Sequence, residues 1–600
     1  MCGEFIGALR FFDELRTGSR SGRTGRRVAA DVRNAGKARE GGGNLETTLC
    51  VCASPFTFNG SLCLINRFMA LIGKPPVIAP PAGAGKESAT RRLTEGRWVL
   101  AATILGSSIA SIDGTAVNVA LPALQAKLGA SITNAQWVIE AYTLFLAALI
   151  LVGGALGDRF GRRRVYALGV GLFAVSSVLC GLSHSIYQLI VFRALQGVGG
   201  ALLIPGSLAI ITVFFGPEER GRAIGTWSAF SAITTALGPV LGGWLVENVS
   251  WRWIFFINVP IAAAVLTILF LRIPESRGGV SDGRVDWAGG LLATLGLGGI
   301  LFGLIESSNL GFSNRLVIAS LVFGALALLA FVIVEGREDS PMMPPSLFRS
   351  ATFTGANVAT LFMYGALGGV FFFLPFALIQ VYGYTATQAG ATLLPIILII
   401  FVLSRWAGVL TDKYGARLPF VAGTVIGAAG YLSLALFNGP GSFLSTFFPG
   451  ITLIGVGLAL SIAPLTTAVM NAVHVEYSGT ASGINNAMAR LAGLVTIAVL
   501  GIVIIHAFGA YLDRGMDKAG IPAEVRAQMD GQRIKLAGAE IPAALGEKLK
   551  AGLEGIVHGS FIGGFEIVLV IAAVMSLIAA AVGFATISGR ETPVRVTRRE

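Results

Sequence analysis

Charged residues are scarce in this sequence, and cysteine and histidine are scarcer still. Asp, Glu, Lys and Arg make up 13% of the 600 residues, hydrophobic residues make up 54%, and mean hydropathy is +0.74. Because soluble domains carry roughly a quarter charged residues, this composition excludes an ordinary soluble protein. The 5 cysteines and 4 histidines show no metal-site spacing, so we expect neither a metal nor a cofactor.

The signatures of an ATP-driven pump and of an enzyme are also missing. The closest match to Gly-x-x-x-x-Gly-Lys-(Ser/Thr) ends at Gly85-Lys86, but Pro80 replaces its first glycine and Glu87 its hydroxyl residue. The histidines are scattered near loop edges, without a nucleophile–base set. The net charge of +12 comes from bases in loops on one side of a predicted membrane, which argues against nucleic-acid binding.

Apolar stretches long enough to cross a bilayer recur along most of the chain. A helix needs about 20 residues to cross a hydrocarbon core of about 30 Å. The stretches of this length are 98–121, 135–156, 165–182, 187–214, 223–246, 253–271, 287–305, 316–334, 353–379, 386–410, 418–437, 443–470, 481–508 and 561–587. The sequence therefore predicts an all-α, polytopic membrane protein with 14 spans.

A ten-residue motif, Gly-x-Leu-x-Asp-(Arg/Lys)-(Phe/Tyr)-Gly-x-Arg, occurs at 154–163 and again at 408–417. Two copies between membrane-length stretches indicate a duplicated helical unit, a common build of secondary transporters. At roughly 30 residues for a span and its loop, the 254 residues between the copies hold eight spans, where a simple duplication would hold six. Two extra spans, 287–305 and 316–334, therefore lie between the halves.

These features divide the chain into five parts. We expect a disordered, uncertain N-terminal tail at 1–96, in which Met69 is an alternative start, followed by a six-helix bundle at 97–275. The remaining parts are two linker transmembrane helices at 276–340, a second six-helix bundle at 341–590 with an outer loop at 509–560, and a tail at 591–600. Apolar residues at helical spacing in the outer loop predict helices there: Ile521, Val525 and Met529, then Leu545, Leu549 and Leu553.

Lysine and arginine are concentrated in the short loops on one side of the spans. These residues are Arg159, Arg162, Arg163, Arg164, Arg220, Arg222, Arg277, Arg284, Arg337, Arg349, Lys413 and Arg417, against little more than Lys127, Arg252 and Arg315 on the other side. Such loops lie in the cytoplasm. We therefore predict a multi-pass protein of the bacterial cytoplasmic membrane with both termini in the cytoplasm.

Three ionisable residues lie inside spans of the first half: Asp113, Glu140 and Arg193. At 1.5 Å per residue, all three are about 8–12 Å below the outer face. Because buried ionisable groups are costly and mark functional sites in membranes, they predict a proton switch in which the arginine pairs with an acid. A static pair that fixes helix packing is the alternative.

The sequence around these residues resembles the 14-span drug:proton antiporters of the major facilitator superfamily. The repeated motif resembles the superfamily's loop between the second and third spans, and 113–122 resembles the antiporters' first-span motif. Residues 193–200 resemble the fourth-span motif, whose arginine is associated with proton coupling, and 238–243 the fifth-span antiporter motif. The resemblance covers 98 to about 587. It implies a major facilitator fold of two six-helix bundles plus two extra central transmembrane helices, driven by a proton gradient.

The predicted site has four groups of residues. The proton-coupling group is Asp113, Glu140 and Arg193; the gating loops are Gly154, Asp158, Arg159, Gly161, Arg162, Arg163, Asp412, Lys413, Gly415 and Arg417; the antiporter motif is Gly238, Pro239, Gly242 and Gly243; and the candidate substrate path is Asn118, Gln196, Trp227, Phe230 and Arg490. Ion pairs in the gating loops would lock one side of the protein in one state. The counterpart of Arg193 in the second half is Ile451, so the switch belongs to the first half.

Together these observations predict a proton-coupled antiporter that exports lipophilic compounds, cationic ones included, and not an enzyme. An exporter of a metabolite such as a sugar, an amino acid or a siderophore-like compound stays open on the same fold, and a non-transporting receptor or scaffold is a remote alternative. The expected partners are a small-molecule substrate, protons and lipid, but no nucleic acid. We expect a monomer, with a periplasmic adaptor protein as an open addition.

Overall fold

The computed structural model describes residues 86–276, 286–338, 341, 343–436, 443–474, 477–542 and 545–588. All of them belong to one compact unit, Arg67–Glu600. The other unit, Met1–Asn66, lies outside the described residues, as do Met69 and the tail 591–600. The described part is helical, without a β-strand, and 14 of its helices are long and apolar enough to cross a membrane. The predicted all-α class and number of spans are confirmed.

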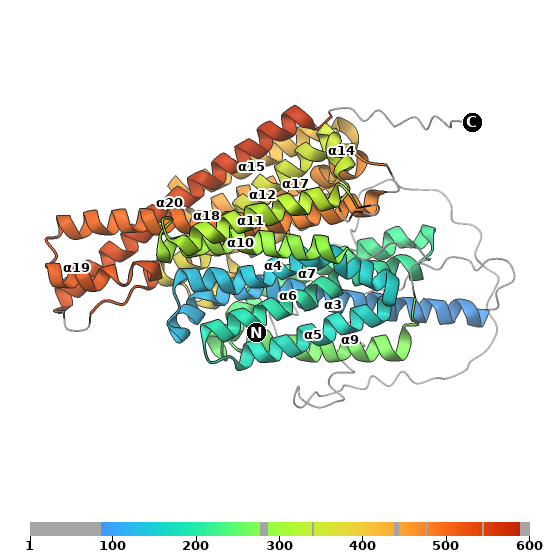
Figure 1. Cartoon of the computed structure of the whole chain (residues 1–600), viewed down its shortest axis with the longest axis horizontal. Helices are drawn as coiled ribbons and strands as arrows, with labels where there is room; N and C mark the ends of the chain where they lie inside the picture. The colour runs from blue at the N-terminus through green and yellow to red at the C-terminus, as the bar shows by residue number, and fades with distance from the viewer. Residues whose placement is uncertain are drawn as a thin grey trace, which may run out of the picture. The chain divides into compact units, whose positions relative to one another are not determined.

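The first six spans form a closely packed group (Figure 1). Their helices are α3 (Lys86–Leu128), α4 (Ile132–Phe160), α5 (Arg162–Leu182), α6 (Ile186–Phe214) and α7 (Pro217–Asn248), with the short α8 (Trp253–Phe256) leading into α9 (Asn258–Arg272). Glycines let α6 approach its neighbours. A Cβ at Gly197 would collide with the Tyr142 carbonyl of α4, and one at Gly199 would lie 2.7 Å from the Phe173 nitrogen of α5. Small residues allow such close approach in membrane bundles.

The two extra helices, α10 (Trp287–Leu310) and α11 (Arg315–Glu335), lie side by side (Figure 1). They meet through small residues, since a Cβ at Gly299 would lie 2.9 Å from the Gly324 Cα. α10 also packs on α4. α11 turns an apolar, exposed face outward, as expected of a helix surrounded by lipid, through Ile318, Val322, Phe323, Leu326 and Leu329.

The second half begins with the short helix η1 (Pro345–Arg349). It continues through α12 (Ala351–Phe376), η2 (Ala377–Val381), α13 (Ala386–Ala391), α14 (Leu394–Tyr414), α15 (Arg417–Leu436), α16 (Phe443–Thr446), α17 (Phe448–Asn471), α18 (Ser478–Lys518), α19 (Ala523–Asp530), η4 (Arg533–Gly538) and α20 (Glu547–Thr586). α15 packs between α17 and α20, and α12 packs against α18 and α20. α18 also contacts α4 and α10.

Some helix bounds differ from the sequence prediction. α3 begins at Lys86, so residues 86–96 are helical and do not belong to a disordered tail. They are too polar to register as a span, but they contain no proline that would break a helix. The predicted span 386–410 is divided into two helices, α13 and α14, and Pro395 lies in the first turn of α14. The segment predicted to be an outer loop contains helices at the predicted places, and α19 buries Val525 and Met529.

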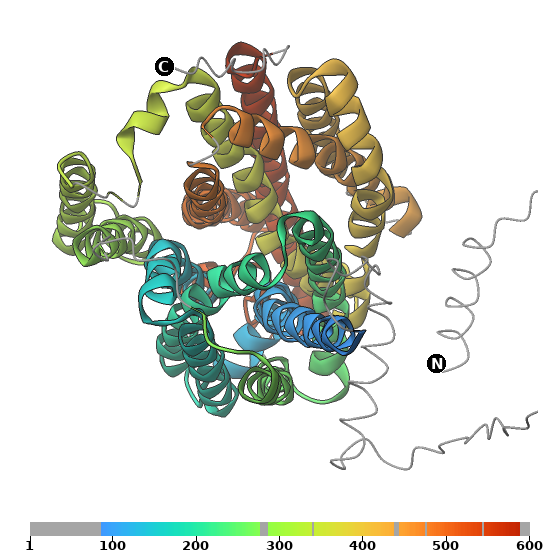
Figure 2. The ribbon, with the colours of Figure 1, turned by 90° about the vertical axis from the view of Figure 1, so that its right-hand side faces the viewer.

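One apolar cluster joins the two halves at one end of the helices, and a smaller one joins α4 to α10 and α18. At the end that carries α19 and η4, one cluster includes Leu124 of α3, Phe372 of α12 and Leu536 of η4. At the opposite end each half has its own core, one confined to residues between Val99 and Ile273 and one to residues between Leu347 and Ile587. Figure 2 views the helices from this opposite end, where the two halves form separate groups. The halves are therefore closed together at the α19 end and separately packed at the other.

Candidate functional site

A buried ion pair lies in the first half, between Asp113 of α3 and Arg193 of α6. Arg193 Nη1 is 2.5 Å from Asp113 Oδ2, and both side chains are 0% exposed. Arg193 Nε donates to the Val138 carbonyl of α4 at 3.0 Å. Its guanidinium lies over the Tyr142 ring, 4.2 Å from the centroid. Two of the three residues predicted to form the proton switch are therefore in direct contact.

Uncharged polar side chains complete a network around this pair. Gln196 Nε2 donates to Asp113 Oδ1 at 2.9 Å and to Ser177 Oγ at 2.8 Å, while Gln196 Oε1 accepts from Arg193 Nη1 at 2.7 Å. Asn258 Nδ2 donates to Asp113 Oδ1 at 3.2 Å. Arg193 Nη2 and Asn258 Oδ1 have no hydrogen-bond partner among the described residues. The network therefore has one unused donor, Arg193 Nη2, and one unused acceptor, Asn258 Oδ1, so its hydrogen bonds can be rearranged.

Ser177 and Asn258 are members of this network that sequence analysis missed. Asn258 interrupts an apolar stretch at the start of α9, and that was the one signal available. Ser177 gave no signal, because a hydroxyl inside a span usually bonds to its own helix. Gln196 was predicted to line the substrate path, but the structure places it inside the ion-pair network with no exposure.

Glu140, the third predicted switch residue, does not join the pair. It precedes Tyr142, whose ring contacts Arg193, by two residues, about 200° around α4 at 100° per residue, so it points away from Arg193. Gln136, one turn earlier on the Glu140 face, donates to the Ile497 carbonyl of α18 at 2.8 Å. Glu140 is 0% exposed, and neither carboxylate oxygen has a hydrogen-bond partner in the described part of the chain. It is a second buried acid, facing the other half.

The predicted substrate-path residues lie at separate places. Arg490 of α18 is close enough to Tyr142 to act on it electrostatically. Tyr142 is therefore near two arginines, Arg193 of the first half and Arg490 of the second. Trp227 Nε1 donates to Ser107 Oγ at 3.0 Å, and Trp227 and Phe230 pack against the first-half core. Asn118 is half-buried on α3. The structure does not gather these residues into one pocket.

The glycines of the antiporter motif lie where α7 meets other helices. A Cβ at Gly242 would lie 2.7 Å from the Ala116 Cβ of α3, and one at Gly238 would collide with Thr115 Oγ1. A Cβ at Gly243 would collide with the Ala386 carbonyl of α13, in the second half. Pro239 lies inside α7. The motif therefore allows α7 to pack closely on both α3 and the other half.

The first gating loop is clamped to the end of α9. Arg162 bridges Asp158 at 2.7 Å and the Ala209 carbonyl of α6 at 3.4 Å. Gly161 has φ +110, a conformation that favours glycine. The carboxylate of Glu275, which sequence analysis missed, accepts from the backbone N–H groups of residues 163 and 164 at 2.9 and 3.2 Å. A carboxylate at the start of α5 also suits the positive end of that helix.

The second gating loop repeats part of this arrangement. Gly415 has φ +77, and Arg417 Nε donates to the Ile587 carbonyl at 2.7 Å, as Arg163 Nη1 donates to the Ile273 carbonyl at 2.9 Å. Gly154 of the first copy lies against α6, whereas the first glycine of the second copy has open space. Asp412 is exposed, and none of the ion pairs found among the described residues includes it.

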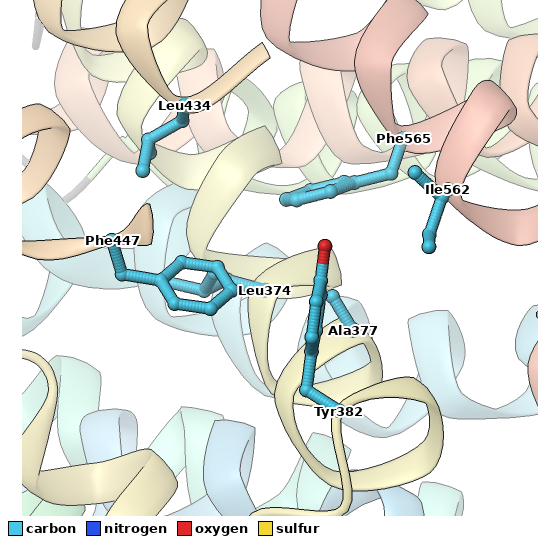
Figure 3. Close-up of a pocket in the computed structure, with 7 residues that line it drawn as sticks. All are labelled: Leu374, Ala377, Tyr382, Leu434, Phe447, Ile562 and Phe565. Atoms are coloured by element: carbon cyan, nitrogen blue, oxygen red, sulfur yellow. The ribbon is translucent and has the colours of Figure 1, made fainter. Parts of the chain in front are cut away.

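A small apolar pocket lies in the second half, away from the ion pair (Figure 3). It is lined by Leu374, Ala377, Tyr382, Leu434, Phe447, Ile562 and Phe565. The Tyr382 hydroxyl points toward Phe565, and its ring meets Phe447 edge-on with centroids 5.0 Å apart. Burial, aided by the negative charge of Glu566, raises the pKa of Tyr382 to about 12, so its hydroxyl stays protonated.

Two helical halves, the first with a buried ion pair, are consistent with a membrane transporter, and comparisons with known proteins identify its family. Residues 103–497 match the model of the Major Facilitator Superfamily. The chain is 33% identical to the tetracenomycin C resistance and export protein of Streptomyces glaucescens, over 81% of this chain and 91% of that protein. It is 34% identical to the puromycin resistance protein pur8 of Streptomyces alboniger, over 77% and 92%. This chain belongs to the major facilitator superfamily.

A solved structure supports the same fold. The inward-facing, unoccupied structure of a bacterial homolog to the human lysosomal transporter Spinster aligns with a TM-score of 0.58, over 83% of this chain and 99% of that chain. At 20% identity this similarity concerns the fold alone. The relatives and the fold are those of transporters of small molecules, not of enzymes.

Proposed function

We propose that this transporter is a proton-coupled antiporter that exports lipophilic compounds from the cytoplasm. The observation that carries the proposal is the fully buried pair of Asp113 and Arg193, surrounded by Gln196 and Asn258. A buried ion pair is weak evidence for stability, because removing two charges from water costs about as much as their attraction returns. A functional role for the pair therefore has to be considered first.

Proton exchange at Asp113 supplies that role. When Asp113 is ionised, it accepts hydrogen bonds from Arg193, Gln196 and Asn258, as in the structure. A proton on Asp113 removes its charge, and Arg193 then turns to its neutral acceptors, the Val138 carbonyl and Gln196 Oε1. Proton binding and release thus change which helices α6 is bonded to. A change of that kind can bias the two arrangements of a transporter.

The two separate cores support a place for this state in the proposed cycle. If the positive loops are cytoplasmic, the end with two cores faces the cytoplasm and the closed α19 end faces outward. The ion pair is then formed in the inward-facing state, after Asp113 has released its proton inside. Cargo binds in that state and leaves on the outer side, where a new proton reaches Asp113. In each cycle, cargo therefore moves out of the cell while a proton moves in.

The proposed cargo is lipophilic, and cationic compounds are included because of Glu140. Its carboxylate is buried, faces α18 and has no hydrogen-bond partner among the described residues. A bound cation would therefore supply a positive charge to balance the carboxylate. The relatives' names mention tetracenomycin C, puromycin and multidrug resistance, and they make export of toxic compounds the leading choice. The metabolite exporter is the alternative outcome of the test.

The test uses an efflux-deficient bacterium that expresses the full chain. Growth protection is screened with matched sets of neutral and cationic lipophilic antibiotics and dyes. Everted membrane vesicles with an imposed pH gradient then show whether uptake requires the gradient, with an uncoupler as the control. Gradient-driven uptake of at least one protective compound is expected. Protection that survives collapse of the gradient would contradict proton coupling, and protection by no compound would favour the metabolite alternative.

A further inference from the structure

Two buried carboxyl groups meet at the end of the extra helices α10 and α11. Asp286 caps α10, and its Oδ1 accepts from the Gly289 N–H at 2.7 Å. Glu335 ends α11, and its Oε2 accepts from the Met343 N–H at 3.0 Å. The other oxygens, Asp286 Oδ2 and Glu335 Oε1, are buried and have no partner among the described residues. Relative exposure is only 8% for Asp286 and 2% for Glu335.

The two remaining oxygens face the same small space. A Cβ at Gly289 would collide with Asp286 Oδ2 and would lie 2.9 Å from Glu335 Oε1. The two carboxyl groups are within hydrogen-bonding reach of each other. We call the contacting side chains of Asp286 and Glu335 the carboxyl dyad. The dyad requires glycine at position 289, because a larger residue would occupy the space between the two carboxyl groups. Two ionised carboxylates at such a separation repel each other, whereas one shared proton turns the contact into a hydrogen bond.

The charges next in sequence do not neutralise the dyad. Glu338 adds another negative charge nearby and is exposed. Arg337 is also exposed, and none of the ion pairs in the described part of the chain includes it. Arg349, in η1 beyond Met343, is likewise exposed. Among the described residues of the dyad's own segments, no cation therefore takes the place of a proton.

The helices packed against α10 bring no neutralising charge either. α4 presents Val152 to Gly290, and its Asp158 and Arg159 lie at its exposed end, where Asp158 is already paired within the gating loop. On α18, Arg490 lies near α4 at the site described above. With no neutralising charge among the described neighbours, the interaction that remains for the dyad is with a proton or a bound cation.

We propose that the carboxyl dyad is a proton-binding site, separate from Asp113, that ties the extra helices to the second half. The shared proton holds Asp286 at the start of α10 against Glu335 at the end of α11. Glu335 in turn holds Met343, in the segment that leads to η1 and α12. Loss of the proton separates the two carboxylates and loosens that connection. Because this end of the helices carries the gating loops, the dyad responds to the pH of the compartment on their side.

The first test measures the melting temperature of the purified full-length protein in lipid nanodiscs across a pH series. The folded dyad holds a proton that an unfolded Asp or Glu releases above about pH 4. Stability is therefore highest at low pH and falls as the pH rises through the range where the folded dyad loses its proton. We expect the wild-type melting temperature to drop by about 2 °C in that range. In Glu335→Gln the drop disappears, because the amide donates to Asp286 without a titrating proton.

Matched variants separate the dyad from general effects of charge. Glu338→Gln removes an exposed carboxylate three residues away and should keep the wild-type pH dependence. Asp286→Asn retains a cap for α10, and it repeats the test if Glu335→Gln does not fold. In infrared spectra, the wild type should show a protonated carboxylic acid band that is lost on alkalinisation and that Glu335→Gln lacks.

Two results would overturn the proposal. One is a pH dependence of melting and an infrared spectrum that are the same in the wild type and in both dyad variants. The other is a rise in wild-type melting temperature with Na⁺, K⁺ or Mg²⁺ at constant pH and ionic strength that Glu335→Gln abolishes, since the dyad would then hold a metal cation. Neither readout requires transport, so the test is independent of the proposed antiport.

Discussion

Replacing Asp113 by asparagine leaves the buried Arg193 without its counter-ion. Breaking a buried ion pair by removing one partner typically costs about 3–5 kcal/mol, because an uncompensated charge remains. Here Arg193 keeps its bonds to the Val138 carbonyl and Gln196 Oε1, and the new amide oxygen can still accept one bond. A hydrogen bond to a charged group contributes about 1.5–3 kcal/mol. Subtracting this contribution from the cost leaves an expected net loss of about 2 kcal/mol in the free energy of unfolding.

The double variant makes this reasoning testable. Arg193→Met alone should also destabilise, because it leaves Asp113 buried with only Gln196 and Asn258 as donors. Asp113→Asn combined with Arg193→Met removes both charges, and a similar exchange of buried ions for neutral groups is often neutral or stabilising. The double variant should therefore melt above either single variant. It should nevertheless show no gradient-driven export in everted vesicles.

Thermal unfolding in nanodiscs and vesicle transport are measured on the same four proteins. A double variant whose loss equals the sum of the two single losses would refute the electrostatic account of the pair. Wild-type export by any of the three variants, at equal protein level, would refute its role in coupling.

Three further predictions concern other parts of the site. Glu140→Gln removes a buried carboxylate that has no hydrogen-bond partner among the described residues, so the melting temperature should be unchanged or higher. Export of cationic compounds should fall relative to neutral ones, and an unchanged ratio would contradict the role of Glu140. Gly242→Ala places a methyl group 2.7 Å from the Ala116 Cβ and should cost about 1–3 kcal/mol of stability. Gly225→Ala in the same helix meets nothing within 4 Å and should be neutral or stabilising, and equal melting of the two would argue against the close packing of α7. Glu275→Ala removes the acceptor of two backbone N–H groups in the first gating loop and should lower the free energy of unfolding by about 1–3 kcal/mol. It should also speed chemical labelling of a cysteine placed in that loop, and unchanged labelling would contradict the role of Glu275 in holding the loop.

The membrane class, the number of spans and the duplication could be predicted from the sequence. A span is a local property: about 20 apolar residues suffice, whatever lies beside them. The gating glycines are local as well, since Gly161 and Gly415 both adopt a positive φ at the same place in the repeated motif. The bounds were less certain, because the polar residues 86–96 extend α3 without any apolar signal.

What the sequence by itself determined was that Asp113, Glu140 and Arg193 lie inside spans at comparable depths. The tertiary structure decided which of them meet. Asp113 and Arg193 are 80 residues apart, yet α3 and α6 bring them to 2.5 Å. Glu140 lies at a comparable depth but on the opposite side of α4 from Tyr142, and it faces the second half. Asp286 and Glu335 gave no signal, because each ends a different helix at the edge of a span. Depth follows from position along one helix, whereas pairing depends on how several helices are rotated and packed against one another.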